Sequence, residues 1–327
     1  MTAPESPLLV TGLPRSGTSW VGKMLEASDE VVYVNEPMNP SHPPGLSPGV
    51  LDARVTRQFQ YISPEDDEQW ARAFTDTLAL RYRLGPELRQ NHSAYDLARM
   101  VKYATSFTAG RLRGRRAMLD DPFAVLSTGW LVQRMGAQAV VLVRDPVSFV
   151  GSWRKLGWSM HFHELLEQPL LVRDHLAPYV DRMRSLVGSP DWLARTCLLW
   201  EMTYDVADRS FRSLPGVHLV GYEDLVAEPV AGFRRLYEQF GLTWSPQAHD
   251  RVVAATSGGE GSAAGSHRWS LRGGLSRTAY RPMSSETALS TFRSRLSAEE
   301  IERVRELTAA VAARVLPTGR VTGAARV

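Results

Sequence analysis

The segment GLPRSGTSW, residues 12–20, combines glycines, hydroxyl side chains and one arginine in a spacing that suits anion binding. It fits the pattern G-x-x-x-x-G-[TS], in which successive backbone N–H groups and the start of a helix surround an anion. Loops of this kind that bind magnesium nucleotides carry lysine where this chain has Thr18, and the nearby cation here is Arg15. The loop therefore favours a ligand with a single terminal anion over a magnesium-bound triphosphate. A plain strand-to-helix turn is the alternative.

A second candidate anion site follows the apolar run AVVLV, which ends at Arg144. Asp145 and Pro146 suit the N-cap and first position of a helix, and Ser148 and Ser152 would lie on one face of it. An arginine at the carboxyl end of a strand, beside the start of a helix, can hold an anion. The alternative is that Arg144 pairs with Asp145 or another surface carboxylate.

Glu36 is the preferred candidate for a general base. It follows the apolar run VVYV, so it lies at the carboxyl end of a strand, where ligands of parallel α/β sheets bind. The competing bases are His42, His161 and His163. His161 and His163 could also suggest a metal site, but no third ligand lies at a recognisable spacing, and no metal is predicted.

These residues must be positioned by an α/β fold. Short apolar runs rich in β-branched residues alternate with helical stretches, which predicts a parallel central sheet flanked by helices. Strands are expected at 8–10, 31–34, 139–143 and 217–220. Helices are expected at 121–135, 146–156, 191–212, 229–240 and 296–316, the last with Ser297 and Glu300 as a capping box.

The whole chain, residues 1–327, is predicted to form one domain. Residues 37–120 read as a proline-rich loop followed by a helical cap that would serve the acceptor, because residues 65–110 show helical spacing. The Gly/Ser-rich run 257–286 is interpreted as a lid loop or a disordered insert. Its arginines, with His267, are candidates to cover a bound phosphate: Arg268, Arg272, Arg277 and Arg281.

Composition points to a cytoplasmic protein with a substantial core. Hydrophobic residues make up 43% of the chain, and no run reaches the length of a membrane span. The segment before the first strand lacks the features of a signal peptide. With 38 basic and 35 acidic residues the net charge is +3, which gives little support for nucleic-acid binding. We therefore expect no nucleic-acid partner and no stable membrane insertion, and the oligomeric state stays open.

The motifs resemble those of sulfotransferases that use 3′-phosphoadenosine 5′-phosphosulfate (PAPS). The first family signature stands here as PRSGTSW, from Pro14 to Trp20, and the second as VLVRDPVSFVGS, in which Ser152 lies eight residues after Arg144. A weaker echo is YEDLVAEP, which begins at Tyr222. The resemblance implies a P-loop-like site for the 5′-phosphosulfate and a bacterial type of sulfotransferase domain.

By this resemblance, Arg15, Thr18, Ser19 and the loop backbone would hold the 5′-phosphosulfate, and Arg15 would also act in catalysis. Arg144 and Ser152 would hold the 3′-phosphate, while aromatic side chains would contact adenine. Certain bacterial carbohydrate sulfotransferases have a glutamate base placed like Glu36, whereas animal cytosolic enzymes use histidine. The implied donor-binding residues are Arg15, Ser16, Gly17, Thr18, Ser19, Trp20, Arg144, Ser152 and Tyr222.

The implied reaction is in-line transfer of a sulfuryl group from PAPS to a hydroxyl of a small molecule, glycoside or glycolipid, with no metal required. One departure is Asp120, because many bacterial relatives have lysine before the dipeptide that reads Asp121-Pro122 here. Asp120 and Asp121 could orient an acceptor amine or pair with Arg15, or Asp121 could simply cap a helix.

Two alternatives to a sulfotransferase remain. A P-loop kinase that uses ATP and magnesium would need the lysine that Thr18 replaces, and also an apolar strand that ends in aspartate near the loop, which the sequence does not reveal. A non-catalytic nucleotide-binding protein would keep the loop without the reaction.

Overall fold

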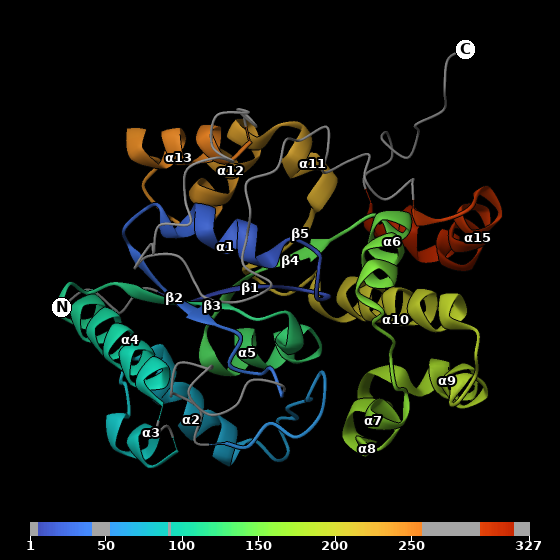
Figure 1. The fold of residues 1–327 in the computed structure, drawn as a ribbon, viewed down its shortest axis with the longest axis horizontal. Helices are drawn as coiled ribbons and strands as arrows, with labels where there is room; N and C mark the ends of the chain where they lie inside the picture. The colour runs from blue at the N-terminus through green and yellow to red at the C-terminus, as the bar shows by residue number, and fades with distance from the viewer. Residues whose placement is uncertain (1–5, 41–52, 91–92, 257–294, 317–327) are drawn as a thin grey trace.

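The computed structural model contains a five-stranded sheet in the order β2-β3-β1-β4-β5, with every neighbouring pair parallel (Figure 1). The structure describes residues 6–40, 53–90, 93–256 and 295–316. The strands are β1 (Leu8–Gly12), β2 (Val31–Asn35), β3 (Arg116–Asp120), β4 (Gln138–Val143) and β5 (Val217–Gly221). The predicted parallel α/β fold is confirmed.

Helices cover both faces of this sheet (Figure 1). They are α1 (Thr18–Glu26), α2 (Glu68–Leu78), α3 (Leu84–Gln90), α4 (Ala94–Leu112), α5 (Thr128–Met135), α6 (Pro146–Leu156), α7 (His163–Leu166), α8 (Pro169–Leu171), α9 (Val180–Leu186), α10 (Trp192–Val206), α11 (Tyr222–Ala227), α12 (Pro229–Gln239), α13 (Pro246–Thr256) and α15 (Ala298–Val315). Short 3-10 or π-helical turns are η1 (Pro122–Ser127), η2 (Val172–Leu176), η3 (Ala177–Tyr179) and η4 (Ala207–Phe211). Within the described ranges, no helix is both long and apolar enough to cross a membrane.

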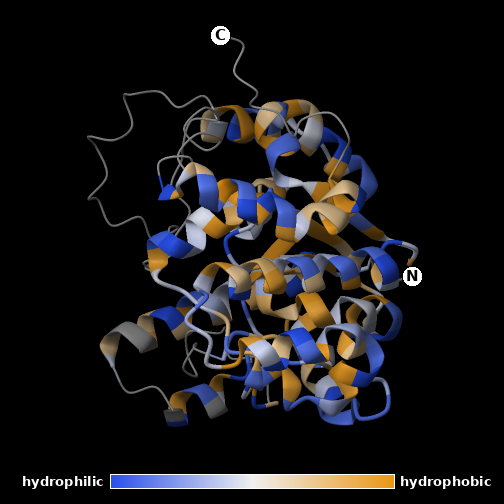
Figure 2. Cartoon of the chain, turned by 90° about the vertical axis from the view of Figure 1, so that its right-hand side faces the viewer, coloured by the Kyte–Doolittle hydropathy of each residue, from blue (hydrophilic) through white to orange (hydrophobic). Residues whose placement is uncertain are grey.

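Successive strand residues point to opposite faces and build two separate cores. Leu8 and Val10 of β1, with Val140 of β4, pack against α1, α12 and α13, whereas Leu9 and Val141 pack against α2, α5 and α10. Because both faces are covered, the central strands are apolar at almost every position. The covering helices carry hydrophobic and hydrophilic residues side by side, as Figure 2 shows, which is typical of helices with one face on a core.

Strand β3 was not predicted from the sequence. Its segment RAMLD has three apolar residues between charged ones, which is a weak strand pattern. Arg116 is nonetheless buried, and its guanidinium donates to the backbone carbonyls of Ser6, at 3.3 Å, and Phe240, at 2.8 Å. Pairing with β1 and β2 on either side makes this segment a strand, and it places Asp120 at the carboxyl edge of the sheet.

Most helices that the sequence predicts are present, with some differences at their ends. Helices α6, α12 and α15 match the predictions closely. The segment predicted as one helix at 121–135 is divided between η1 and α5, and the one at 191–212 between α10 and η4. Helices α2, α3 and α4 occupy the segment predicted as a helical cap, and residues of α2 and α4 also join the core on β2 and β3.

The predicted capping box at the start of α15 is confirmed. The hydroxyl of Ser297 accepts a hydrogen bond from the Glu300 backbone N–H at 3.1 Å, and the Glu300 carboxylate accepts one from the Ser297 N–H at 2.8 Å. Both bonds satisfy backbone donors that the first helical turn leaves without partners.

The Ser297→Ala variant should therefore lose about 1 kcal/mol of unfolding free energy, because the side-chain cap disappears. Urea unfolding followed by circular dichroism measures this change. Ser213 lies exposed in a turn, so Ser213→Ala is the control and should shift the unfolding free energy by no more than about 0.5 kcal/mol. Equal losses in both variants would contradict the capping role.

Candidate active site

The direction of the chain connections reverses between the carboxyl ends of β1 and β4. The chain leaves β1 through α1 toward β2 at one edge of the sheet, and it leaves β4 toward β5 at the other edge. Such a topological switch point is where open parallel sheets bind ligands. Gly12 pairs with Leu142 in this register, so the loop after β1 and Arg144 after β4 emerge side by side.

The loop after β1 has free backbone donors beside this switch point. Arg15 and Gly17 have positive φ angles of 78° and 96°, and α1 begins at Thr18. Within the described part of the chain, the N–H groups of Gly17, Thr18 and Ser19 donate to no protein acceptor. Free N–H groups at the start of a helix suit an anion, because the helix dipole adds positive charge there.

Residues from the two anion sites predicted from the sequence are in direct contact. The Arg144 Nη1 donates to the backbone carbonyl of Arg15 at 2.6 Å, and the Arg15 Nε donates to the Ser152 hydroxyl at 3.4 Å. The register of β1 and β4 brings these side chains together at the ends of the two strands.

Positive charge is concentrated at this contact. Partial desolvation of the otherwise solvent-exposed Arg15 lowers its pKa, and the charges of Arg144 and then Arg295 lower it further. Among the described residues, Arg15 forms no ion pair. An anion bound here would relieve the repulsion between the guanidinium groups.

An aromatic wall stands beside the loop. The Tyr222 ring lies 5.1 Å from the Arg144 guanidinium, and the Trp20 ring meets Tyr222 edge to face at 5.7 Å between centroids. Glycine is required at position 17 for two reasons, since its φ is positive and a Cβ there would lie 2.5 Å from the Tyr222 ring. The loop and the wall are thus packed directly on each other.

Glu36 lies at the same edge of the sheet, directly after β2. Its backbone N–H donates to the Asp120 carbonyl at 2.8 Å, and the Asn39 amide donates to its carboxylate at 2.7 Å. Burial raises the pKa of Glu36 to about 7, although the Asn39 bond lowers it, and the negative charge of Asp120 raises it further. A carboxylate with this pKa is suited to accept a proton near neutral pH.

Asp120 is completely buried at the end of β3. The Tyr33 hydroxyl donates to one carboxylate oxygen, and the other oxygen has no hydrogen-bond partner among the described residues. Burial raises the pKa of Asp120, while the hydrogen bond from Tyr33 and the nearby Thr18 and Ser19 hydroxyls oppose that rise. The statement that no apolar strand ends in aspartate near the loop is therefore wrong, because β3 pairs directly with β1.

The Asp121 carboxylate binds backbone groups and so has a structural role. Its carboxylate accepts hydrogen bonds from the backbone N–H groups of Phe123, at 3.0 Å, and Met38, at 2.5 Å. The first bond caps η1, as the helix-capping alternative suggested, and the second ties the segment after Glu36 to the sheet.

The family of the chain can now be stated. A model of the sulfotransferase family matches residues 7–246, which is well over half of the chain. The protein belongs to the sulfotransferase family. The matched range contains the anion loop, Glu36, Arg144, Ser152 and Tyr222.

Solved structures similar to this sulfotransferase share little sequence with it. The sulfotransferase domain from the curacin biosynthetic pathway is 13% identical with a TM-score of 0.45, covering 93% of this chain and 98% of that one. Sulfotransferase STF9 from Mycobacterium avium is 16% identical with a TM-score of 0.40, covering 95% and 77%. Retinol dehydratase in a complex with retinol and PAP is 14% identical with a TM-score of 0.38, covering 98% and 84%. No curated protein matches the chain.

The sulfotransferase site contains residues that the sequence did not single out. The Glu223 carboxylate, at the start of α11, accepts a hydrogen bond from the Asp145 N–H at 3.0 Å and so links β5 to the start of α6. Burial, followed by the charge of Asp145, raises the pKa of Glu223 to about 7. Arg295 contributes charge near Arg15. The only sequence signal for Glu223 was its position beside Tyr222.

Among the described residues, neither of the competing histidines His161 and His163 makes a hydrogen bond, ion pair or ring contact with the anion loop. His161 and His163 are exposed, and among the described residues their ring contact is with each other, at 5.8 Å between centroids. His42 and the predicted lid, residues 257–286, lie outside the described residues.

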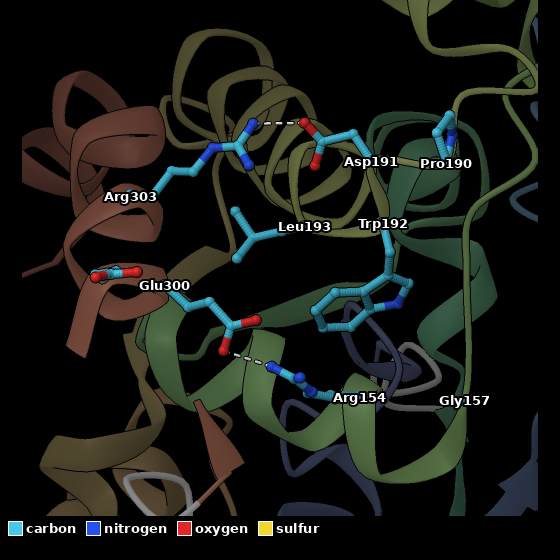
Figure 3. Close-up of a pocket in the computed structure, with 9 residues that line it drawn as sticks. Arg154, Gly157, Pro190, Asp191, Trp192, Leu193, Glu300 and Arg303 are labelled. Atoms are coloured by element: carbon cyan, nitrogen blue, oxygen red, sulfur yellow. Dashed lines mark hydrogen bonds and ion pairs between the residues drawn. The ribbon is translucent and has the colours of Figure 1, made fainter. Parts of the chain in front are cut away.

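A cavity of about 640 Å³ lies away from the anion loop, where α6 ends and where α10 and α15 begin (Figure 3). Four of its charged side chains form two ion pairs. Arg154 binds Glu300 at 2.5 Å, and Arg303 binds Asp191 at 2.5 Å, with Trp192 lining the wall between them (Figure 3). These ion pairs connect α15 to α6 and to the start of α10. None of the candidate active-site residues lines this cavity.

The glycine requirement at position 17 can be tested by stability. Gly17→Ala should cost more unfolding free energy than Gly136→Ala, because both put alanine at a positive φ but only position 17 adds a clash with Tyr222. The backbone strain alone is about 1 kcal/mol at each site. Chemical unfolding of the two variants measures the difference. In a Tyr222→Ala background the excess cost of Gly17→Ala should shrink; an unchanged excess would contradict the proposed contact.

Proposed function

We propose that this sulfotransferase moves the sulfuryl group of PAPS to a hydroxyl of a small molecule, glycoside or glycolipid. The observation that carries the proposal is the contact of Arg144 with Arg15 across the switch point, beside Tyr222. The two neighbouring arginines and the aromatic ring beside them support a binding site for one nucleotide. A donor with an anionic group at each end of an adenosine suits that arrangement.

In this proposal each end of the donor has its own set of partners. The backbone of residues 15–19, with the side chains of Arg15, Thr18 and Ser19, holds the 5′-phosphosulfate. Arg144 and Ser152 hold the 3′-phosphate. Trp20 and Tyr222, which contact each other and the loop, face adenine.

The reaction is an in-line displacement at sulfur. The acceptor oxygen forms a new bond to sulfur while the bond from sulfur to the bridging 5′-phosphate oxygen breaks, which releases adenosine 3′,5′-bisphosphate and a sulfate ester. Glu36 accepts the proton that the hydroxyl loses. Arg15 stabilises the negative charge that develops on the leaving oxygen, and it does so by charge alone because a guanidinium does not readily give up its proton.

Asp120 shapes this chemistry indirectly. Because position 120 is an aspartate, Arg15 is the cation that the proposal places next to the reacting group. Asp120 is buried against Tyr33 and raises the pKa of Glu36, which makes Glu36 a stronger base. The acceptor is proposed only as a hydroxyl compound.

Isothermal titration calorimetry tests the donor site. The wild-type protein should bind adenosine 3′,5′-bisphosphate without metal, and Arg144→Ala should weaken binding by about 10- to 100-fold, because a charge-assisted contact is lost. Arg81→Ala, which removes an exposed arginine paired with Asp76, is the control and should leave affinity unchanged. Undiminished affinity in Arg144→Ala would overturn this assignment of the 3′-phosphate site.

The base can be tested through the pH dependence of the rate. With an acceptor found in a panel of alcohols and phenols, kcat/KM should rise with pH up to about 7 and then level off, because ionised Glu36 is the active form. Glu36→Gln should lower kcat by at least about 100-fold and remove this limb of the profile. His161→Ala and His163→Ala should keep both. Loss of activity in a histidine variant alone would assign the base to that histidine.

One observation keeps a P-loop kinase as a second candidate. Asp120 ends a strand adjacent to β1 and lies near Ser19, as a magnesium-binding aspartate would in a kinase. Its complete burial against Tyr33 and the absence of the loop lysine favour the sulfotransferase. Preferred binding of ATP with magnesium would support the kinase, and binding without transfer to any acceptor would support a non-catalytic nucleotide-binding protein.

A further inference from the structure

We infer that Tyr204 is a positioning residue that sets the shape of the anion loop and its place relative to Arg144. The inference rests on the proposed function, since it concerns how the donor site is held. Tyr204 lies in α10, is fully buried and belongs to none of the sequence motifs that mark the site. Its hydroxyl nevertheless reaches the loop after β1 and the end of β4 at once.

The hydroxyl of Tyr204 uses its whole hydrogen-bonding capacity. It donates to the Leu142 carbonyl at 2.8 Å. A phenol has one proton, so its other contacts must be accepted bonds: from the Leu13 backbone N–H at 3.3 Å and from the Ser16 hydroxyl at 2.9 Å. One oxygen atom therefore joins two residues of the loop to the strand that leads to Arg144.

Three further side chains bind backbone carbonyls of the loop or of the β4 end. The Trp153 indole N–H donates to the Pro14 carbonyl at 3.0 Å, and Arg144 donates to the Arg15 carbonyl. The Trp200 indole N–H, one helical turn before Tyr204, donates to the Arg144 carbonyl at 2.8 Å. With these carbonyls bound by protein side chains, the N–H groups of Gly17, Thr18 and Ser19 stay available to an anion.

The loop needs this external support because its own conformation is strained. Arg15 has a positive φ although it is not glycine, and Gly12 lies so close to β4 that a Cβ would be 2.5 Å from the Leu142 carbonyl. Replacing Tyr204 by phenylalanine would leave the Leu13 N–H and the Leu142 carbonyl buried without this partner. The structure thus assigns to the Tyr204 hydroxyl the maintenance of loop geometry rather than bulk packing.

The experiment compares wild type, Tyr204→Phe and Tyr237→Phe. Tyr237 is an equally buried tyrosine whose hydroxyl donates to the Met24 carbonyl at 2.6 Å, away from the loop, so its loss controls for a missing buried hydrogen bond. Calorimetry measures binding of adenosine 3′,5′-bisphosphate, adenosine 5′-monophosphate and adenosine 3′-monophosphate. Hydrogen exchange of the peptide that covers residues 13–19 reports loop order without any nucleotide.

Tyr204→Phe should weaken both ligands that carry a 5′-phosphate by about tenfold and the 3′-monophosphate by less than about threefold. Exchange in residues 13–19 should be faster in Tyr204→Phe only. Tyr237→Phe should bind all three ligands as wild type does, even if its melting temperature falls. A merely structural tyrosine would lower melting temperature without this selectivity for the 5′-phosphate.

Equal affinities and equal loop exchange in wild type and Tyr204→Phe would overturn the inference while leaving the proposed function intact. No binding of adenosine 3′,5′-bisphosphate to wild type would overturn the proposed function, and exchange of the loop would then still decide whether Tyr204 orders it. If Tyr204→Phe does not fold, Ser16→Ala provides a second test, because it removes one donor to the same hydroxyl. Ser16→Ala should weaken the ligands that carry a 5′-phosphate more than the 3′-monophosphate, by a smaller factor than Tyr204→Phe. Equal affinities of Ser16→Ala and wild type would count against the inference.

Discussion

The parallel pairing of β1 with β4, with Gly12 opposite Leu142, is the constraint on which the site depends. It fixes where the loop after β1 and the turn after β4 leave the sheet, and it brings the Leu142 carbonyl within reach of the Tyr204 hydroxyl. The segments after β1 and β4 leave the sheet at the same level, and this allows Arg144 to donate to the Arg15 carbonyl. A slip in register would move one arginine away from the other.

Charge is divided along the carboxyl edge of this sheet. The side of β1 and β4 carries the arginines, whereas the side of β2 and β3 carries Glu36, Asp120 and Asp121. Burial raises the pKa of each of these carboxyls. In the proposed reaction the anionic donor lies on the cationic side, and the acceptor proton leaves toward the acidic side.

Hydrogen bonds to backbone groups hold this arrangement more than ion pairs do. Tyr204, Trp153 and Trp200 each bind a backbone group of the loop or of the β4 end, and each comes from a helix that the core holds in place. Ion pairs gather elsewhere, as between α15 and the ends of α6 and α10. Among the described residues, Arg15 of the anion loop therefore has no ion pair, while the carbonyls of Pro14 and Arg15 are bound.

The local sequence was sufficient for features that depend on neighbouring residues. The glycine spacing of the anion loop, the cap before α6, the capping box of α15 and the alternation of apolar runs with helices all act over a few residues, so the fold class and the sulfotransferase family could be predicted. The strand β3 could not, because its short charged segment becomes a strand only between two partners. Tyr204 and Glu223 also escaped prediction, since each acts on a segment more than fifty residues away in the chain. The residues of each anion motif can be recognised in the local sequence, but the contact between the two motifs was decided by strand order and register, because only the sheet sets the distance between its strand ends.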